Sequence, residues 1–487
     1  MQRLNSPVFR TVAYVNGLFC LYLSIAMLAP MAVDYFDGNP DWRGFLVSAL
    51  LTGTLSGATV LASRGNFPRF TPRVGFLLVA TLWLFSTLVA SLPIMLGSAG
   101  MSFTDAVFEA MSGLTTTGAT VITGLDDKPR GLLVWRSLTQ WIGGLGIVAV
   151  GLLLLPYLKI GGMQFFRMES SERGDKPVAR LETFAIWLVS IYVSLTLACA
   201  VLYASFGMSW FDAINHAMTT VATSGFSTHD TSFAQYGNGV LVVSMVFMLI
   251  AAMPFAVFFI SLFSGTLRES FDEQIPVLTG VVFLLTVPVY LGALAGGSLA
   301  PLDALTHAAF NVVSIVTTTG YASADYTLWG PATVAAVLLA TFLGGCTGST
   351  SGGIKTYRLI ILFRTVSTGV RNLVYPNGVF PVHYNGRRVG DDTVRAVAAF
   401  FFAFMAILLI CTIAVAATGL DLVTAFSGSL ASVSNVGPAL GNIIGPAGNY
   451  SSLPDAAKWV LTLAMFLGRL EIMTILVVAS PFFWRSV

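Results

Sequence analysis

Four short segments place small polar side chains just before a glycine, a composition that can bind a small cation through oxygen atoms. They read TDAVFEAMSGLTTTGAT (104–120), FDAINHAMTTVATSGFS (211–227), LTHAAFNVVSIVTTTGYAS (305–323) and LVTAFSGSLASVSNVGPAL (422–440). Aligned on Gly118, Gly225, Gly320 and Gly437, each segment has alanine twelve residues upstream and a small residue six residues upstream. A single copy would suit a tight turn that ends a helix, but four copies in register indicate a repeated functional unit.

The glycine of each segment permits a backbone conformation that presents consecutive carbonyl oxygens to one side. No carboxylate lies in the residues around it, so an ion bound there would be held by carbonyl dipoles and could leave again. This arrangement favours conduction of a weakly hydrated monovalent cation over storage of a divalent one.

Each segment is too short to cross a bilayer as a helix. About ten helical residues rise roughly 15 Å, which is half of a hydrocarbon core near 30 Å. We therefore expect four re-entrant loops, each a half-crossing helix with Asp105, Asp212 or Thr424 as an outer N-cap, followed by an extended returning strand. Lipid cannot satisfy the carbonyls of such strands. The strands must line one wet cavity, with the negative helix ends directed toward a cation.

The composition predicts a polytopic membrane protein. Of 487 residues, 55% are hydrophobic and 10% charged, and the mean hydropathy is +0.81, whereas soluble domains carry about 25% charged residues. The net charge of +2 gives no reason to expect a nucleic-acid partner. Apolar runs long enough to span a bilayer occupy 12–33, 44–63, 74–97, 132–157, 183–206, 239–264, 276–297, 332–365, 394–417 and 456–484, the eighth interrupted by glycines.

These runs predict an all-α fold with ten transmembrane helices, an N-terminal pair followed by four span–pore helix–span repeats around a pseudo-fourfold pore. The expected units are the N-terminal extension at 1–73 and repeats at 74–160, 161–268, 269–372 and 373–487. Basic residues fix the orientation. With the N-terminus inside, nineteen of them fall on the cytosolic side and five on the outer side, which places both termini in the cytoplasm.

The four segments resemble the filter loops of the Trk/Ktr/HKT superfamily of potassium transport subunits, most closely those of the bacterial TrkH/TrkG type. The matching motifs are TTTGAT (115–120), TSGFSTHD (223–230), TTTGYASADY (317–326) and SNVGPALG (434–441). The resemblance implies potassium uptake across the bacterial inner membrane. It also implies that the backbone carbonyls which bind potassium are those of Thr116, Thr117, Thr223, Ser224, Thr318, Thr319, Asn435 and Val436. Glycine at all four filter positions goes with potassium selectivity in this superfamily.

The resemblance further implies partners. A homodimer is expected, together with a cytosolic nucleotide-binding regulatory subunit of the RCK type (TrkA-like). The cytosolic loops at 159–180 and 355–395 carry twelve of the nineteen inner basic residues. They could form a docking face for that subunit, although lipid headgroups would explain the same charges.

Two elements outside the filter indicate a gate. The stretch LGGCTGSTSGGIKTYR (343–358) cannot stay helical in lipid unless it lines a cavity, and the resemblance implies a flexible loop beneath the filter. Its expected gate residues are Gly344, Gly345, Gly348, Ser349, Thr350, Ser351, Gly352, Gly353 and Lys355.

Arg469 stands in the last apolar run, where a charge seldom faces lipid, and it would act as a positive barrier under the filter. The alternatives are a kinked helix with small interface residues and a structural arginine bonded to neighbouring carbonyls.

Other functions stay open at this point. The same scaffold could serve as a sodium-permeable channel or a cation-coupled potassium symporter. An intramembrane enzyme is a third possibility, but no GxGD, HExxH or Ser–His pairing is apparent, and the four histidines lack metal-ligand spacing. We therefore expect no enzymatic activity and no cofactor, with K⁺ as the transported ion.

Overall fold

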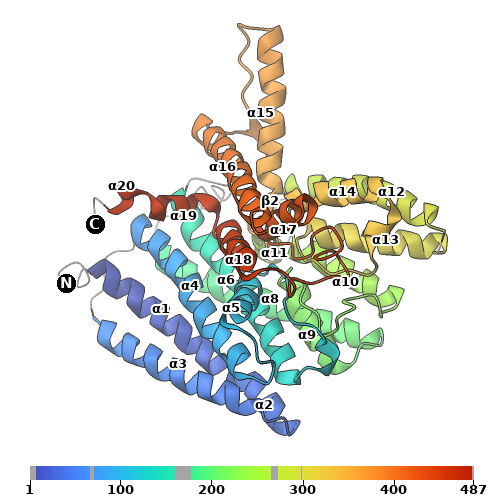
Figure 1. Cartoon of the computed structure of the whole chain (residues 1–487). Helices are drawn as coiled ribbons and strands as arrows, with labels where there is room; N and C mark the ends of the chain where they lie inside the picture. The colour runs from blue at the N-terminus through green and yellow to red at the C-terminus, as the bar shows by residue number, and fades with distance from the viewer. Residues whose placement is uncertain (1–6, 66–70, 159–176, 265–271, 298, 485–487) are drawn as a thin grey trace.

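The computed structural model describes residues 7–65, 71–158, 177–264, 272–297 and 299–484 (Figure 1). The long and medium helices are α1 (Pro7–Ala26), α2 (Leu28–Phe36), α3 (Trp42–Ser63), α4 (Pro72–Leu96), α6 (Arg130–Leu158), α8 (Pro177–Ser205), α10 (Asn238–Ala251), α11 (Phe255–Ser264), α12 (Gln274–Ala295), α14 (Pro331–Phe342), α15 (Thr356–Val374), α16 (Asp391–Ala416), α18 (Asp455–Arg469) and α19 (Ile472–Ala479). The remaining elements are the pore helices described below, the short helices η2 (Leu125–Asp127), η3 (Tyr326–Trp329) and α20 (Pro481–Trp484), and the strands β1 (Leu343–Gly344), β2 (Ile354–Lys355), β3 (His383–Tyr384) and β4 (Arg387–Arg388).

The fold is predominantly helical, as the composition predicts. In the described part of the chain, seven helices are long and apolar enough to cross a membrane, or eight if the bent pair α18–α19 counts as one span. Large apolar side chains on the outer helices, such as Leu61 of α3 and Phe283 of α12, are exposed. Burial of apolar residues inside and exposure of others outside is the pattern of a helix bundle that lipid surrounds.

The run at 12–33 is interrupted at Met27 between α1 and α2, and three further predicted apolar runs are not single helices. The run at 239–264 divides into α10 and α11 around Pro254, which has no N–H to donate to a helix. The run at 332–365 divides into α14 and α15, and the parallel pair β1–β2 joins the two ends of the glycine-rich loop between them. The run at 456–484 bends by 106° between α18 and α19, where Glu471 has a φ of +58°.

Four short helices correspond to the predicted half-crossing segments. They are α5 (Phe103–Leu114), α9 (Trp210–Val221), α13 (Pro301–Val316) and α17 (Leu422–Ser434). With 12, 12, 16 and 13 residues they rise about 18–24 Å, less than the roughly 30 Å of a hydrocarbon core. Their C-terminal halves are buried, so the pore helices lie inside the bundle.

The expected N-caps of three pore helices were wrong by one turn. The Ser102 hydroxyl accepts from the Asp105 N–H, and Ser209 accepts in the same way from Asp212. In α17 the cap is Asp421, which accepts from the Thr424 N–H. The acidic residues at the third helical position complete the turn, because each serine hydroxyl also donates to the carboxylate at that position.

The N-terminal pair lies at one edge of the molecule, and α15 projects from the opposite part. Helices α1 and α3 pack against each other and α1 also packs on α4, so that this pair covers the outside of the first repeat (Figure 1). Helix α15 follows the glycine-rich loop and extends well beyond the remaining helices (Figure 1). The central pore helices are thus enclosed by the long helices of all four predicted repeats.

Candidate functional site

All four pore helices end in the same hydrogen-bonded turn. In each, the N–H of the residue before the filter glycine donates to the carbonyl oxygen six residues before that glycine. The four pairs, at 2.8–3.0 Å, are Thr117–Ser112, Ser224–Thr219, Thr319–Ser314 and Val436–Ala431. This is the long bond of a Schellman motif, and its acceptor is the residue at which a small side chain recurs in the sequence.

The residue that reverses the chain in each turn has a left-handed conformation. Thr116, Thr223, Thr318 and Asn435 have φ values of 53°, 48°, 59° and 54°. Asparagine tolerates this region, but a β-branched threonine there is strained, at a cost of order 1–3 kcal/mol for each residue. The filter glycines, two residues later, also have positive φ, between 79° and 94°. Each filter segment therefore has two residues with positive φ, separated by one residue that does not have it.

The four filter glycines contact their neighbours in one cyclic order. Each faces the carbonyl oxygen of the residue that precedes another segment's glycine. The pairs are Gly118–Ser224, Gly225–Thr319, Gly320–Val436 and Gly437–Thr117. A Cβ atom on any of them would overlap that oxygen, so only glycine fits. The contacts run from the first segment through the fourth and back to the first, and they bring the four filter segments together as the sequence predicts.

The eight carbonyl groups inferred from the resemblance are not equivalent. The Ser224 oxygen accepts a hydrogen bond of 2.7 Å from the Gln140 side chain of α6. Within the described residues, the other seven oxygens accept none. Gln140 also accepts from the Ser224 hydroxyl and from the Phe226 N–H. Sequence reasoning missed Gln140, because nothing in the apolar run at 132–157 indicates which of its side chains faces a filter strand.

A cavity of about 460 Å³ lies against the four filter glycines on the side away from the glycine-rich loop, which is called the outer side below, and the side of that loop is called the inner side. Its wall includes all four glycines, the returning strands and the loop that follows the fourth segment. Tyr450 of that loop donates its hydroxyl to the Gly437 carbonyl and its N–H to the Thr120 carbonyl, at 2.7 and 2.9 Å. The loop thereby ties the fourth strand to the first.

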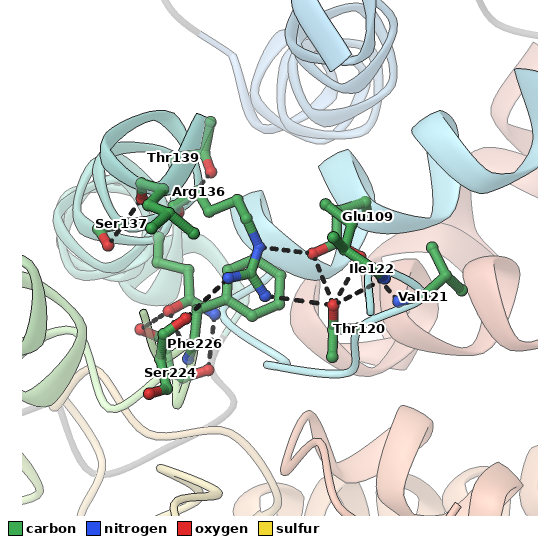
Figure 2. Close-up of polar contacts among 12 residues, drawn as sticks. Glu109, Thr120, Val121, Ile122, Arg136, Ser137, Thr139, Ser224 and Phe226 are labelled. Atoms are coloured by element: carbon green, nitrogen blue, oxygen red, sulfur yellow. Dashed lines mark hydrogen bonds and ion pairs between the residues drawn. The ribbon is translucent and has the colours of Figure 1, made fainter. Parts of the chain in front are cut away.

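Behind the first strand lies a buried ion pair that the sequence analysis did not foresee. The carboxylate of Glu109 on α5 accepts from the Arg136 Nε of α6 at 2.8 Å, and both side chains are almost fully buried. Arg136 also donates to the Ser227 carbonyl and to the Thr120 hydroxyl, and its guanidinium lies 4.1 Å from the centre of the Phe226 ring (Figure 2). One side chain therefore holds the returning strands of the first and second segments together.

Other outer charges are also paired. Lys458 of α18 donates to Asp105 at 2.6 Å. His229 lies between the carboxylates of Asp212 and Asp126. The hydrogen bond to Asp212 and the bond to Asp126 raise the pKa of His229 to about 9, and the same contact lowers the pKa of Asp126. The His229–Asp126 pair joins the loops of the first two segments, and the Lys458–Asp105 pair joins α18 to the first pore helix.

The glycine-rich loop lies directly beneath the filter turns and is bonded to three of them. The Thr223 hydroxyl donates to the Thr350 hydroxyl at 3.1 Å, and the Gly352 N–H donates to the Thr318 hydroxyl at 2.7 Å. The Gly353 N–H reaches the Ser434 carbonyl at 2.8 Å. The predicted gate residues are therefore in contact with the predicted filter.

The other expected gate residues shape the same loop. Gly344 pairs with Lys355 in the β1–β2 ladder, and Gly348 has a φ of 84°. Ser349 donates to the Cys346 carbonyl, and Lys355 donates to the Ser351 carbonyl. Gly345 has no room for a side chain, because a Cβ atom would lie 2.5 Å from the Ser351 hydroxyl.

Arg469 lies at the break between α18 and α19, not within a continuous span. Its side chain is 3% exposed, and none of its three guanidinium nitrogens has a hydrogen-bond partner in the described residues. It lines a cavity of about 70 Å³ together with Lys355 and the glycine-rich loop. Glu471, two residues on, pairs instead with Arg358 of α15. The alternative interpretation, a structural arginine bonded to neighbouring carbonyls, therefore finds no such bond in the described residues.

No metal centre or catalytic cluster accompanies these features. Among the residues that the structure describes, no three His, Cys, Asp or Glu side chains gather closely enough to hold a metal ion. The four cysteines are buried and unpaired.

Comparison with known proteins matches the chain along almost its whole length. The TrkH family, described as a cation transport protein family, matches residues 54–289 and 273–486. The Trk system potassium uptake protein TrkI of Halomonas elongata is 39% identical over 99% of this chain and 97% of the relative. TrkH of Escherichia coli K12, a Trk system potassium uptake protein, is 35% identical over 98% of this chain and 100% of its own length.

A solved structure agrees in fold. The crystal structure of the potassium transporter TrkH from Vibrio parahaemolyticus has a TM-score of 0.90 and 34% sequence identity, and it covers 98% of this chain and 100% of that one. The relatives are transporters, in line with the expectation that the chain is not an enzyme. By sequence and by structure, the chain is a multi-pass membrane protein that belongs to the TrkH family of cation transport proteins.

Proposed function

We propose that this protein takes up potassium across the bacterial inner membrane through a selectivity filter built from its four re-entrant segments. The observation that carries the proposal is the cyclic contact of four glycines with four carbonyl oxygens. A closed set of carbonyl groups can replace the hydration shell of a weakly hydrated cation. Potassium uptake by the related Trk proteins supports the choice of ion.

The strained turns supply the preorganisation that such a filter needs. Strain of order 1–3 kcal/mol at a threonine persists only where surrounding bonds over-determine the conformation, as the Schellman bonds do here. The four pore helices end at the filter, so their negative ends add attraction for a cation. Seven of the eight proposed ligand oxygens accept no hydrogen bond in the described residues and are available to an ion.

The glycine-rich loop and Arg469 form the gate in this proposal. The cavity beneath the filter, about 70 Å³, is far smaller than the outer cavity of about 460 Å³, so less open space adjoins the filter on the inner side. Arg469 contributes a buried positive charge that opposes a cation there. Movement of the loop would widen the path and change the position of Lys355.

The finer architecture is part of the same proposal. We count ten crossings by treating α10–α11, α14–α15 and α18–α19 as broken spans, with the repeats at 74–160, 161–268, 269–372 and 373–487 around a pseudo-fourfold axis. The boundaries near 160 and 268, the basic loop at 159–176 and both chain ends lie outside the described residues. Cytoplasmic termini, a homodimer and a TrkA-like RCK subunit follow from the family resemblance and the positive-inside count.

Complementation of a bacterium that lacks potassium uptake tests the proposal. The wild-type chain should restore growth at low external K⁺. Gly118→Ser and Gly320→Ser should lower the ratio of K⁺ to Na⁺ uptake by at least about tenfold. In each variant the added Cβ atom overlaps a carbonyl oxygen of the neighbouring filter segment, and the backbone has a positive φ that serine rarely adopts. Gly237→Ser is the matched control, because that N-cap position has open space and suits serine.

Two outcomes would contradict the proposal. A well-expressed wild-type chain that moves no potassium would remove the transport function. Unchanged ion ratios in both filter variants would place selectivity elsewhere in the molecule.

A further inference from the structure

One position recurs behind the filter in three of the four repeats. Nine residues before each filter glycine the pore helices carry Glu109, His216 and Asn311. All three side chains are polar, and Glu109, His216 and Asn311 are buried. Buried polar groups at one register of a repeat require partners, and here each partner lies on the returning strand of the same segment.

Each of these side chains holds the strand that returns from its own filter glycine. The Glu109 carboxylate accepts from the Val121 N–H at 2.9 Å. The Asn311 side chain accepts from the Ser323 N–H at 3.1 Å, in the corresponding place three residues after the glycine. In the second repeat, the His216 Nε2 bonds the Ser227 hydroxyl, two residues after the glycine, at 3.0 Å.

The fourth repeat uses a neighbouring position for the same contact. The residue at the matching register is Gly428, where a Cβ atom would lie 2.8 Å from the Ile444 side chain. Ser427, one residue earlier, accepts from the Leu440 N–H at 3.1 Å. Leu440 again lies three residues after its filter glycine. Four different side chains therefore hold four equivalent strands.

We propose that His216 and Asn311, together with Glu109 and Ser427, are positioning residues that set the ion selectivity of the filter. The inference rests on the proposed potassium filter. A smaller ion such as Na⁺ is well coordinated only if the carbonyl groups move inward, and a strand fixed to its pore helix resists that movement. None of these four residues lines the cavity at the filter glycines, so each acts through the position of the strand it holds.

The contact strengths differ between repeats. Glu109 is charged and is held in turn by Arg136, whereas the other three side chains make bonds without a salt bridge in the described structure. Charge-assisted bonds are roughly twice as strong as neutral ones. The first strand is thus held most firmly, and the second and third are the places where a single substitution loosens the filter without removing a buried ion pair.

The test measures K⁺ and Na⁺ uptake of purified full-length protein in proteoliposomes. His216→Ala and Asn311→Ala should each lower the K⁺/Na⁺ uptake ratio about fivefold, which corresponds to the net free energy of about one hydrogen bond. The rate of K⁺ uptake itself should fall by a smaller factor than this ratio. His216→Asn gives the second repeat the side chain that the third repeat has at the matching position, Asn311. This variant should keep most of the wild-type K⁺/Na⁺ uptake ratio. Asn215→Ala is the control, because that side chain donates to its own helix at Phe211.

The outcomes separate this inference from the function on which it rests. Wild-type protein that transports no potassium, or does not prefer it to sodium, defeats the proposed function. Selective wild-type protein with unchanged ratios in His216→Ala and Asn311→Ala defeats the positioning role alone. If His216→Ala does not fold, Ser227→Ala removes the same contact from the strand side, and an unchanged ratio there also overturns the inference.

Discussion

Two buried arginines lie on opposite sides of the filter and have opposite surroundings. Arg136, on the outer side, is 2% exposed and donates to Glu109, Ser227 and Thr120. Arg469, on the inner side, is 3% exposed, and none of its guanidinium nitrogens has a hydrogen-bond partner in the described residues. Burial is nearly the same, so the difference lies entirely in what each guanidinium contacts.

The comparison separates a structural charge from a functional one. A buried charge is costly unless it is paired, and Arg136 meets that condition while it joins two filter strands. Arg469 has no such partner, and it faces a small cavity beneath the pore helices. The negative ends of these helices stabilise its positive charge in place of a side-chain partner. We infer that the outer side of the filter is fixed and that the inner side retains a charge free to act on an ion.

The largest expected effect is a loss of stability in Arg136→Leu. The substitution leaves the Glu109 carboxylate buried without its cation, a change that costs about 3–5 kcal/mol in the free energy of unfolding. Thermal unfolding in detergent should show a clearly lower midpoint. Arg469→Leu, in the same assay, should unfold at or above the wild-type temperature, since no hydrogen bond is lost.

A double variant sharpens this result. Glu109→Gln with Arg136→Leu should recover part of the loss, because an amide can still accept from the Val121 N–H and no charge remains buried. Equal midpoints for wild type and Arg136→Leu would show that the ion pair contributes nothing, and the contrast between the two arginines would then fail.

The next effect concerns transport. Arg469→Ala should raise potassium uptake about tenfold, which corresponds to a barrier lowered by about 1.4 kcal/mol, because the positive charge beneath the filter is removed. Arg469→Lys, which keeps the charge, should stay close to wild type. Uptake in proteoliposomes with equal amounts of reconstituted protein gives the comparison. An unchanged rate in Arg469→Ala would exclude this residue from the gate.

The sequence predicts the filter segments better than the buried ion pair on the outer side of the filter. The four glycines and the half-crossing helices follow from a repeat in register, because equivalent residues fold alike, whereas the place of the glycine-rich loop beneath the filter is what the family resemblance implies. The sequence does not predict that Glu109 and Arg136 form a pair. Their positions 27 residues apart, on different helices, give no sign that the side chains meet.

The break in the last span was missed for a related reason. The run at 456–484 has no proline before Pro481, and Gly468 alone does not end a helix in sequence-based prediction. In the structure, a Cβ atom on Gly468 would overlap the Val433 carbonyl of α17. The close approach of a second helix, which hydropathy cannot report, brings α18 to its end beside the fourth filter turn.

A smaller effect is expected at the contact between loop and filter. The Thr350 hydroxyl accepts from Thr223 and donates to carbonyls of Val221 and Ala251. Thr350→Val removes these bonds with little change in volume and should raise potassium uptake about fivefold, the factor of about one hydrogen bond. Thr341→Val is the control, because its hydroxyl bonds only within α14. If both variants transport like wild type, the loop is not held shut by this contact.

The smallest effect is a pH dependence confined to the outer side. His229 has a pKa raised to about 9 by Asp212 and Asp126, so its protonated form favours the folded protein. That contribution is complete below pH 6.5, the ordinary pKa of histidine, and is lost as pH rises through 9. The thermal midpoint of wild type should therefore fall by a few degrees between pH 6.5 and 9.5, and it should fall further than the midpoint of His229→Gln.

His216, which packs near His229, is retained in both proteins, so the difference between their pH profiles isolates the contribution of His229. Identical pH profiles would mean that the carboxylates do not hold the imidazole in its charged form, and the outer side would then be less firmly fixed than the Arg136 network indicates.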